Sequence, residues 1–182
     1  ALLLLLPART LAAAKRPIRF DRLSLEQGLS QSSVNRILQD RRGYVWLATE
    51  DGLNRYDGIG FKVYRHDVSD VASLPASFVW DLAQDSAGNL WIATRGGLAS
   101  WHRASDRIVR TETLAGQDMR ALAFAPKDDA LWVGTRDSGL YRLQIATGAL
   151  TRFVHDPATS SSLVDDRIYA LSVDRAGRLW IG

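Results

Sequence analysis

Residues 40–56 have the sequence DRRGYVWLATEDGLNRY, and this stretch decides the fold because it contains two tight turns around one alternating strand. In DRRG, the Asp at the first turn position and the Gly three residues later suit a type I hairpin turn followed by a left-handed residue. In YVWLAT, Trp46 and Ala48 share one face of the strand while Leu47 and Thr49 share the other. EDG turns the chain again, so the stretch predicts the middle of an antiparallel β-sheet.

The same stretch recurs along the chain. DSAGNLWIATRGGLASW begins at Asp85, KDDALWVGTRDSGLYRL begins at Lys127 and DRAGRLWIG begins at Asp174. The repeated tryptophans are Trp46, Trp91, Trp132 and Trp180, and we expect their large aromatic side chains to form the core between neighbouring blades. Three apolar positions also recur at fixed spacing upstream of them: Leu29, Val34 and Ile37; Leu74, Val79 and Leu82; Leu114, Met119 and Leu122; Leu163, Ile168 and Leu171.

Each period accommodates four antiparallel strands, which in the first are VNRILQD, YVWLAT, LNRYD and FKVYRHD. Four strands per ~40–45 residues are typical of a β-propeller blade. A β-sandwich is the alternative, but a sandwich requires neither equal periods nor a repeated Trp. We expect an all-β chain with about three and a half blades, cut before the ring closes, over about residues 29–67, 74–111, 114–156 and 163–182.

Composition supports a turn-rich β protein. The chain has 182 residues, of which 46% are hydrophobic and 24% charged, as in a soluble globular domain. Asp far outnumbers Glu and Arg far outnumbers Lys, which favours turns over exposed helix faces. The net charge of +3 comes from scattered single residues, so no nucleic-acid partner is expected, and the absence of Cys excludes disulfides and thiolate sites.

The beginning of the chain suggests export. Residues 1–14, ALLLLLPARTLAAA, form an apolar run followed by small residues, with Ala12 and Ala14 at the spacing of a signal-peptidase site. We interpret residues 1–17 as a clipped signal peptide and linker; a short apolar helix docked on the domain is the alternative. Residues 18–25 resemble the outer-strand segments FKVYRHD and LTRFVHD, so we expect an outer strand that clasps a distant blade of the same propeller.

The pattern D-x-x-G-x-x-W-[LI]-[AG]-T-x-x-G-L, together with FDRLSLEQGLSQSSVNRILQDRRGYVWLATEDGLNRYDG, resembles the two-component-regulator propeller repeats of bacterial sensor proteins over residues 18–182. The resemblance implies a periplasmic propeller region in an inner-membrane protein, followed by a β-sandwich module, a membrane helix and a cytoplasmic histidine kinase or GGDEF diguanylate cyclase. It also allows a homodimer through the parent. The third repeat departs from the pattern, with KDDA in place of the D-x-x-G turn and one extra residue before Gly139.

The residues offer little catalytic chemistry. No nucleotide-binding, zinc-hydrolase or serine-hydrolase motif is present, and no metal or cofactor is expected. His66-Asp67 and His155-Asp156 recur in two repeats, which favours a structural role over a general base. Asp165-Asp166 could ligate calcium, but no spaced series of oxygen ligands surrounds the pair, so we favour a solvated loop end.

The unrepeated positions suggest where a ligand would bind. The residue after the second recurring apolar position changes from repeat to repeat, and the turn after the Trp strand returns to the same end of the blade. Aromatic, Arg and carboxylate side chains gathered there suit an unknown small molecule or a glycan fragment. The candidate residues are Asn35, Trp80, Arg120 and Tyr169, with Glu50, Arg95 and Arg136 from the turns.

Three functions are therefore considered. The first is a non-catalytic, ligand-sensing propeller that controls a downstream membrane-linked output domain. The second is a secreted propeller enzyme acting on glycans, and the third is a protein-interaction scaffold. A single cluster of carboxylates with a His on one face would favour the enzyme, and the sequence offers none.

Overall fold

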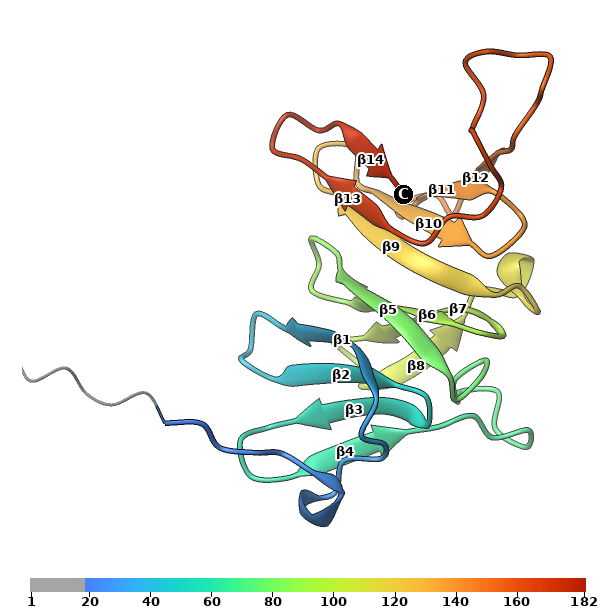
Figure 1. Ribbon diagram of the computed structural model, residues 1–182. Coiled ribbons are helices and arrows are strands. Elements are labelled where there is room, and N and C mark those ends of the chain that lie inside the picture. The colour runs from blue at the N-terminus through green and yellow to red at the C-terminus, as the bar shows by residue number, and fades with distance from the viewer. Residues whose placement is uncertain (1–18) are drawn as a thin grey trace, which may run out of the picture.

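The computed structural model describes residues 19–182, which form four antiparallel sheets arranged one after another (Figure 1). Strands follow their sequence order within each sheet, so each sheet is one propeller blade and the predicted fold class is confirmed. The first blade contains β1 (Val34–Gln39), β2 (Val45–Thr49), β3 (Gly52–Tyr56) and β4 (Phe61–Tyr64). The second contains β5 (Val79–Gln84), β6 (Leu90–Thr94), β7 (Gly97–His102) and β8 (Arg107–Arg110). The third contains β9 (Met119–Ala125), β10 (Ala130–Thr135), β11 (Leu140–Gln144) and β12 (Leu150–Phe153), and the fourth β13 (Leu171–Val173) and β14 (Leu179–Ile181).

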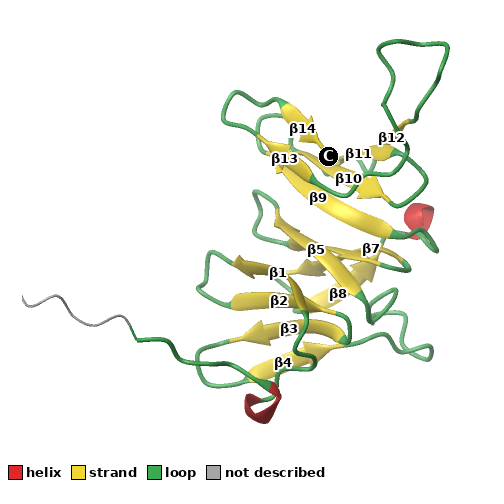
Figure 2. Cartoon of the chain, in the orientation of Figure 1, coloured by secondary structure: helices red, strands yellow, loops and turns green. Residues whose placement is uncertain are grey.

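The first strand of each blade is the inner one. β1 lies beside β5, β5 beside β9 and β9 beside β13, so these strands form a continuous row across the molecule. Figure 2 shows how little helix accompanies them: the described residues contain only the single-turn 3-10 helices η1 (Leu25–Gln27) and η2 (Glu112–Leu114). No described helix has the length and apolar character to cross a bilayer.

Apolar side chains fill the spaces between blades. The cluster between the first two blades includes Trp46, Leu53, Ile92 and Trp101, and all four side chains are buried. A second cluster between the second and third blades includes Ala93, Leu98, Leu131 and Val133. Alternation along each strand assigns its side chains to these two sides in turn, as the period-2 pattern of the sequence predicts.

The first three repeated tryptophans face the following blade, and the burial of each repeated tryptophan reflects what lies on that side. Trp46 is fully buried, with its ring centroid 4.8 Å from that of Trp101 in the second blade. Trp91 is partly buried against the second cluster, and Trp132 is also partly buried. Trp180 is 58% exposed, in contrast to the core position expected for it, because the described residues contain no blade beyond the fourth.

The motif D-x-x-G-x-x-W has a direct structural meaning. In three blades the tryptophan indole N–H donates a hydrogen bond to the carboxylate that begins the turn. The pairs are Trp46 with Asp40 (2.8 Å), Trp91 with Asp85 (3.2 Å) and Trp180 with Asp174 (3.1 Å). The same carboxylates accept backbone N–H groups within the turn, so the aspartate fixes both the hairpin and the indole. The third blade lacks this aspartate, and its turn instead places Asp129 at a φ of 45°, an irregularity consistent with its divergent sequence.

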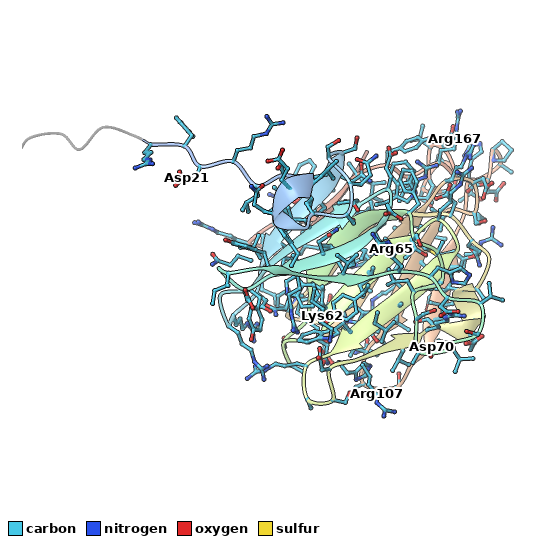
Figure 3. The ribbon with its side chains drawn as sticks, turned by 90° about the horizontal axis from the view of Figure 1, so that it is seen from below. Asp21, Lys62, Arg65, Asp70, Arg107 and Arg167 are labelled. Carbon is cyan, nitrogen blue, oxygen red and sulfur yellow. The ribbon has the colours of Figure 1, made fainter. Side chains whose placement is uncertain are left out.

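Residues 19–24 leave the first blade without pairing with any described strand, and Figure 3 shows Asp21 on this projecting segment. Ser24 then ends the extended chain by capping η1: its backbone N–H donates to Gln27 Oε1 at 2.8 Å. The clasp strand expected over residues 18–25 is therefore not formed here, and Phe20 is 90% exposed. Its partner would come from elsewhere in the protein, so the clasp stays a prediction. Residue 18 and the export signal expected over residues 1–17 lie outside the described residues.

A carboxylate in the turn between β7 and β8 joins the outer parts of the first two blades. Asp106 accepts hydrogen bonds from Lys62 Nζ (2.9 Å), Arg55 Nη1 (3.2 Å) and Tyr64 Oη (3.2 Å) of the first blade. From its own blade it accepts the Trp101 indole N–H at 2.7 Å. Partial burial acts to raise the pKa of Asp106, but the hydrogen bonds from Lys62 and Trp101 outweigh burial and lower the pKa to about 2.

This low pKa predicts acid sensitivity of the contact between the first two blades. A carboxyl with a pKa lower in the folded state stabilises the fold above its unfolded pKa of about 4, and the contribution disappears as pH falls from about 4 through about 2. We expect Asp106→Asn to flatten the dependence of unfolding free energy on pH in that window, measured by urea unfolding of the full-length protein. Unchanged pH dependence in the variant would contradict the assignment.

Candidate functional site

The inner strands share a β-bulge near their first residue. Val34 pairs with Thr49 and Arg36 with Ala48, so Asn35 is the unpaired residue of the first bulge. A bulge turns a side chain away from the regular alternation of the strand, and bulges are common beside binding sites.

The other blades repeat this arrangement. Trp80 is unpaired between Val79 and Asp81, and Arg120 is skipped where Met119 pairs with Thr135. In the fourth blade the backbone N–H groups of Tyr169 and Ala170 both donate to the carbonyl of Gly182. Three of the four unrepeated positions identified in the sequence are therefore bulged positions of their inner strands, and Tyr169 lies two residues before β13.

Three of these residues, from three successive blades, lie close together. The Arg120 guanidinium carbon lies 3.8 Å from the centroid of the Trp80 ring and 5.9 Å from that of Tyr169. Such cation–π contacts are more favourable where the cation is shielded from water, and the Arg120 side chain is only 15% exposed. Phe78 also packs against Trp80, and the centroids of the two rings are 4.2 Å apart.

Asp118 lies at the centre of this group. It accepts the Trp80 indole N–H at 3.0 Å and the Arg120 Nη2 at 2.7 Å. Arg136 Nη1, from the turn after β10, is 3.9 Å from the same carboxylate, and its side chain is 54% exposed. We call Trp80, Asp118, Arg120, Arg136 and Tyr169 the inner-strand cluster.

The sequence analysis did not identify Asp118. The available signal was positional, because Asp118 immediately precedes a recurring apolar residue, where the other blades carry Ser33, Phe78 and Arg167. This position also changes from blade to blade, so the repeat architecture does not require a carboxylate there.

The remaining candidates are placed differently. Asn35 Nδ2 donates to the backbone carbonyl of Val79 at 2.8 Å, so Asn35 lies beside the start of β5 and links the first two inner strands. Glu50 and Arg95 are exposed, and neither side chain forms a hydrogen bond or ion pair within the described residues. Of the seven candidates, the inner-strand cluster therefore contains Trp80, Arg120, Tyr169 and Arg136. Asn35 lies next to the cluster, while Glu50 and Arg95 stay outside it.

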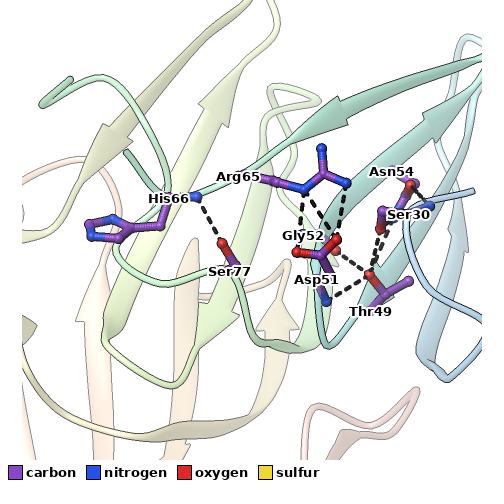
Figure 4. Close-up of polar contacts among 8 residues, drawn as sticks. All are labelled: Ser30, Thr49, Asp51, Gly52, Asn54, Arg65, His66 and Ser77. Carbon is purple, nitrogen blue, oxygen red and sulfur yellow. Dashed lines mark hydrogen bonds and ion pairs between the residues drawn. The ribbon is translucent and has the colours of Figure 1, made fainter. Parts of the chain in front are cut away.

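A repeated turn between the second and third strands of each blade carries Arg95 and Arg136. In each of the first three blades a threonine hydroxyl donates across this turn to a glycine carbonyl. The pairs are Thr49 with Gly52 (2.8 Å), Thr94 with Gly97 (2.7 Å) and Thr135 with Gly139 (2.7 Å). Figure 4 shows the first of these turns, where Ser30, Asn54 and the Asp51–Arg65 ion pair extend the network.

The backbone fixes these turns in the molecule as well. The Arg136 N–H donates to the Asp118 carbonyl at 3.0 Å, and the equivalent Arg95 N–H donates to the Phe78 carbonyl at 3.0 Å. Arg136 is thus held beside Asp118 by its backbone, while its guanidinium is free to move in solvent.

The repeated histidines have structural environments. His66 Nδ1 is 2.7 Å from the Leu74 carbonyl and His155 Nδ1 is 2.6 Å from the Leu163 carbonyl, closing two similar loops. The carboxylates considered for calcium are engaged elsewhere: Asp165 pairs with Arg167 at 2.7 Å, and Asp166 accepts the backbone N–H of His155 at 2.7 Å. Within the described part of the chain, no three His, Asp or Glu side chains are grouped so that they could hold a metal ion.

Four-stranded blades in sequence order, with bulged inner-strand residues converging at one end, define a β-propeller region with a candidate binding surface beside its inner strands. The two-component regulator propeller family model matches residues 28–51, 73–96 and 162–182. These three segments are similar to the repeats of this family, as the sequence pattern indicates. A curated relative, histidine kinase P4 of Formosa agariphila, is 53% identical over 47 residues, which are 26% of this chain and 3% of that protein.

Solved structures agree with the family. The extracellular domain of BT3049, assigned to a hybrid two-component system of B. thetaiotaomicron, matches with a TM-score of 0.75 and 30% identity over 89% of this chain and 23% of that one. The extracellular domain of BT4673 from the same organism gives 0.74 and 27%, over 86% and 21%. A gluconolactonase of Xanthomonas campestris gives 0.58 and 18%, over 81% and 55%, a likeness of fold alone. This chain thus spans about a quarter or less of the two-component proteins that it matches.

Proposed function

We propose that this chain belongs to the periplasmic, ligand-sensing region of a bacterial transmembrane signalling protein. The observation that carries the proposal is the convergence of Trp80, Arg120 and Tyr169, residues at the start of three successive inner strands, beside Asp118. A ligand that contacts all three blades senses their relative positions, which a ligand held by one blade cannot do.

The chemistry of the cluster suits a small polar molecule or a glycan fragment. Tyr169 is 58% exposed and offers a ring face, while Arg136 offers guanidinium N–H groups to ligand oxygen atoms. Trp80 and Arg120 are more enclosed and form the floor of the surface. No described residue takes the part of a nucleophile or general base in this arrangement, so binding without turnover is the simplest function.

The relatives support a signalling role. One is named a histidine kinase, and two of the solved neighbours are extracellular domains of two-component or one-component systems. We propose a downstream histidine kinase or diguanylate cyclase as the output, with dimerisation through the parent protein. Ligand binding would change the output only as far as the ligand binds one arrangement of propeller and downstream module more tightly than the other.

The proposal is tested with Trp80→Ala combined with Arg136→Ala in the full-length protein. Removing an aromatic floor and an arginine donor is expected to lower sensitivity to the signal by about 30-fold or more, since each contact contributes on the order of 1–2 kcal/mol. The measurement is signal-dependent output in cells, with protease resistance of the propeller as a check on folding. Arg107→Ala, on the exposed outer strand β8, is the control and should respond as wild type.

A double variant that responds like wild type would contradict the site. The enzyme alternative makes a different prediction, namely that the purified protein hydrolyses or lyses a glycan and loses this turnover when site residues are changed. A scaffold would show neither response nor turnover, but would lose a protein partner on mutation of an exposed blade edge.

A further inference from the structure

The carboxylate of Asp118 occupies the place where an anionic ligand would bind. Its oxygens are engaged by the Trp80 indole N–H at 3.0 Å and the Arg120 guanidinium at 2.7 Å, with the Arg136 guanidinium 3.9 Å away. Two guanidinium groups and one N–H donor around a planar carboxylate form a complete recognition set for such a group. Asp118 is a member of the chain itself, so the site is filled from within.

Several observations indicate that this occupancy is not a requirement of the fold. The equivalent residues of the other blades are Ser33, Phe78 and Arg167, so a propeller blade forms without an acid at this position. The arrangement also leaves two buried polar atoms without partners. Arg120 Nε donates no hydrogen bond, and the Oε1 atom of Gln117, the residue before Asp118, accepts none. Buried polar atoms are usually paired, so the two unpaired atoms make the present arrangement less favourable than one that satisfies them.

The charge of the surface favours an anion. Within the inner-strand cluster, Arg120 and Arg136 face the single carboxylate of Asp118, and Arg95 on the neighbouring turn has no side-chain partner among the described residues. The distance of 3.9 Å leaves the Arg136 guanidinium only weakly paired, and it is the more exposed of the two. One positive charge is therefore available to a ligand even before Asp118 moves.

We propose that the ligand of this surface is an organic carboxylate, which displaces Asp118 from Arg120 and Arg136 while its ring or chain packs against the exposed face of Tyr169. This inference rests on the proposed binding site and adds the chemical class of its ligand. In the exchange one carboxylate replaces another on the same donors, so the enclosed arginine is never left unpaired and the released Asp118 is hydrated. A neutral isostere cannot compete for these donors on equal terms, because its hydrogen bonds lack the charge.

The competition gives Asp118→Asn a distinctive effect. Asparagine keeps an oxygen that can accept the Trp80 indole N–H, but it holds the two arginines less strongly. We expect carboxylate affinity to rise by about tenfold in this variant, the reverse of what loss of an ordinary binding residue produces. Asp137→Asn is the matched control, because it removes the same charge from an exposed position next to Arg136. Since salt screens exposed charges, this variant should change the carboxylate affinity by less than about twofold.

The experiment is equilibrium dialysis of the full-length protein in detergent against radiolabelled benzoate and benzamide, probes of the same shape that differ in charge. The expected result is that benzoate binds at least tenfold more tightly than benzamide, that Asp118→Asn strengthens benzoate binding alone, and that Arg136→Gln abolishes the preference. Asp118→Asn that weakens benzoate binding would overturn the exchange, since Asp118 would then be positioning Arg120 for the ligand.

Other outcomes separate this inference from the proposed function. Equal binding of benzoate and benzamide, lost for both in Tyr169→Ala, would overturn the carboxylate class and leave the site intact. Benzoate binding that is unaffected by Arg136→Gln, Asp118→Asn and Tyr169→Ala would overturn the carboxylate inference at this surface. The proposed function then depends on the cellular response of the Trp80 and Arg136 double variant.

Discussion

Trp46→Ala is expected to lower the free energy of unfolding by about 3–5 kcal/mol, the usual range for truncating a fully buried aromatic side chain. The Trp46 ring packs 4.8 Å from Trp101 and 6.0 Å from Tyr64, centroid to centroid. Its removal leaves a cavity between the first two blades and takes one hydrogen bond from the buried carboxylate of Asp40. Pulse proteolysis of the full-length protein in urea measures the loss.

Trp46→Phe separates the two causes. Phenylalanine restores most of the buried area but not the indole N–H, so the loss should shrink to about 1–2 kcal/mol, the cost of an unmatched buried acceptor. A loss from Trp46→Ala no larger than that from Trp46→Phe would show that the tryptophan serves the Asp40 turn alone and does not hold the blades together.

The blades were predictable from the sequence because each depends on local chemistry that recurs. Asp40 fixes a hairpin turn and binds an indole six residues later, so the turn and the core anchor appear together in the motif. Thr49 and Gly52 fix the next turn, where the Thr49 hydroxyl donates to the Gly52 carbonyl. Contacts within a few residues leave a sequence pattern, and repetition of that pattern revealed the architecture.

The site was only partly predictable. The bulged residues Trp80 and Arg120 stood out because they vary where the repeat is otherwise regular, and the structure shows that they touch. In the sequence Asp118 resembles an ordinary loop acid. One of its partners is an indole 38 residues away, and such a distant contact leaves no local sequence pattern. Arg95 was expected in the cluster because it occupies the same turn as Arg136, yet of the two only Arg136 lies beside a carboxylate. The reason is the residue that precedes the inner strand, which is Asp118 in the third blade and Phe78 in the second.

The turn after β10 contributes both to the stability of the fold and to the proposed binding surface. Thr135 and Gly139 hold the turn that begins with Arg136, and the backbone N–H of Gly139 donates to Asp166 at the start of the fourth blade. A change at this turn therefore affects the packing of two blades and the position of Arg136 in the proposed site together.

Gly139→Ala is expected to destabilise the protein by about 3 kcal/mol or more, because two costs add at this position. The φ of +80° lies in the left-handed region, where an L-residue with a side chain costs about 1–2 kcal/mol. An added Cβ would also collide with the backbone carbonyl oxygen of Phe153 on β12, a neighbour that cannot rotate away as a side chain could.

Gly148→Ala in the same blade is the matched control, because Gly148 has a φ of +72° and no atom within 4 Å of the added Cβ. It carries the conformational cost without the collision, so its loss should stay within about 1–2 kcal/mol. The difference between the two variants, measured by pulse proteolysis in urea, isolates the close approach of the turn to β12. Equal losses would mean that the turn shifts away from β12 without cost, and the placement of Arg136 beside Asp118 would then owe nothing to Gly139.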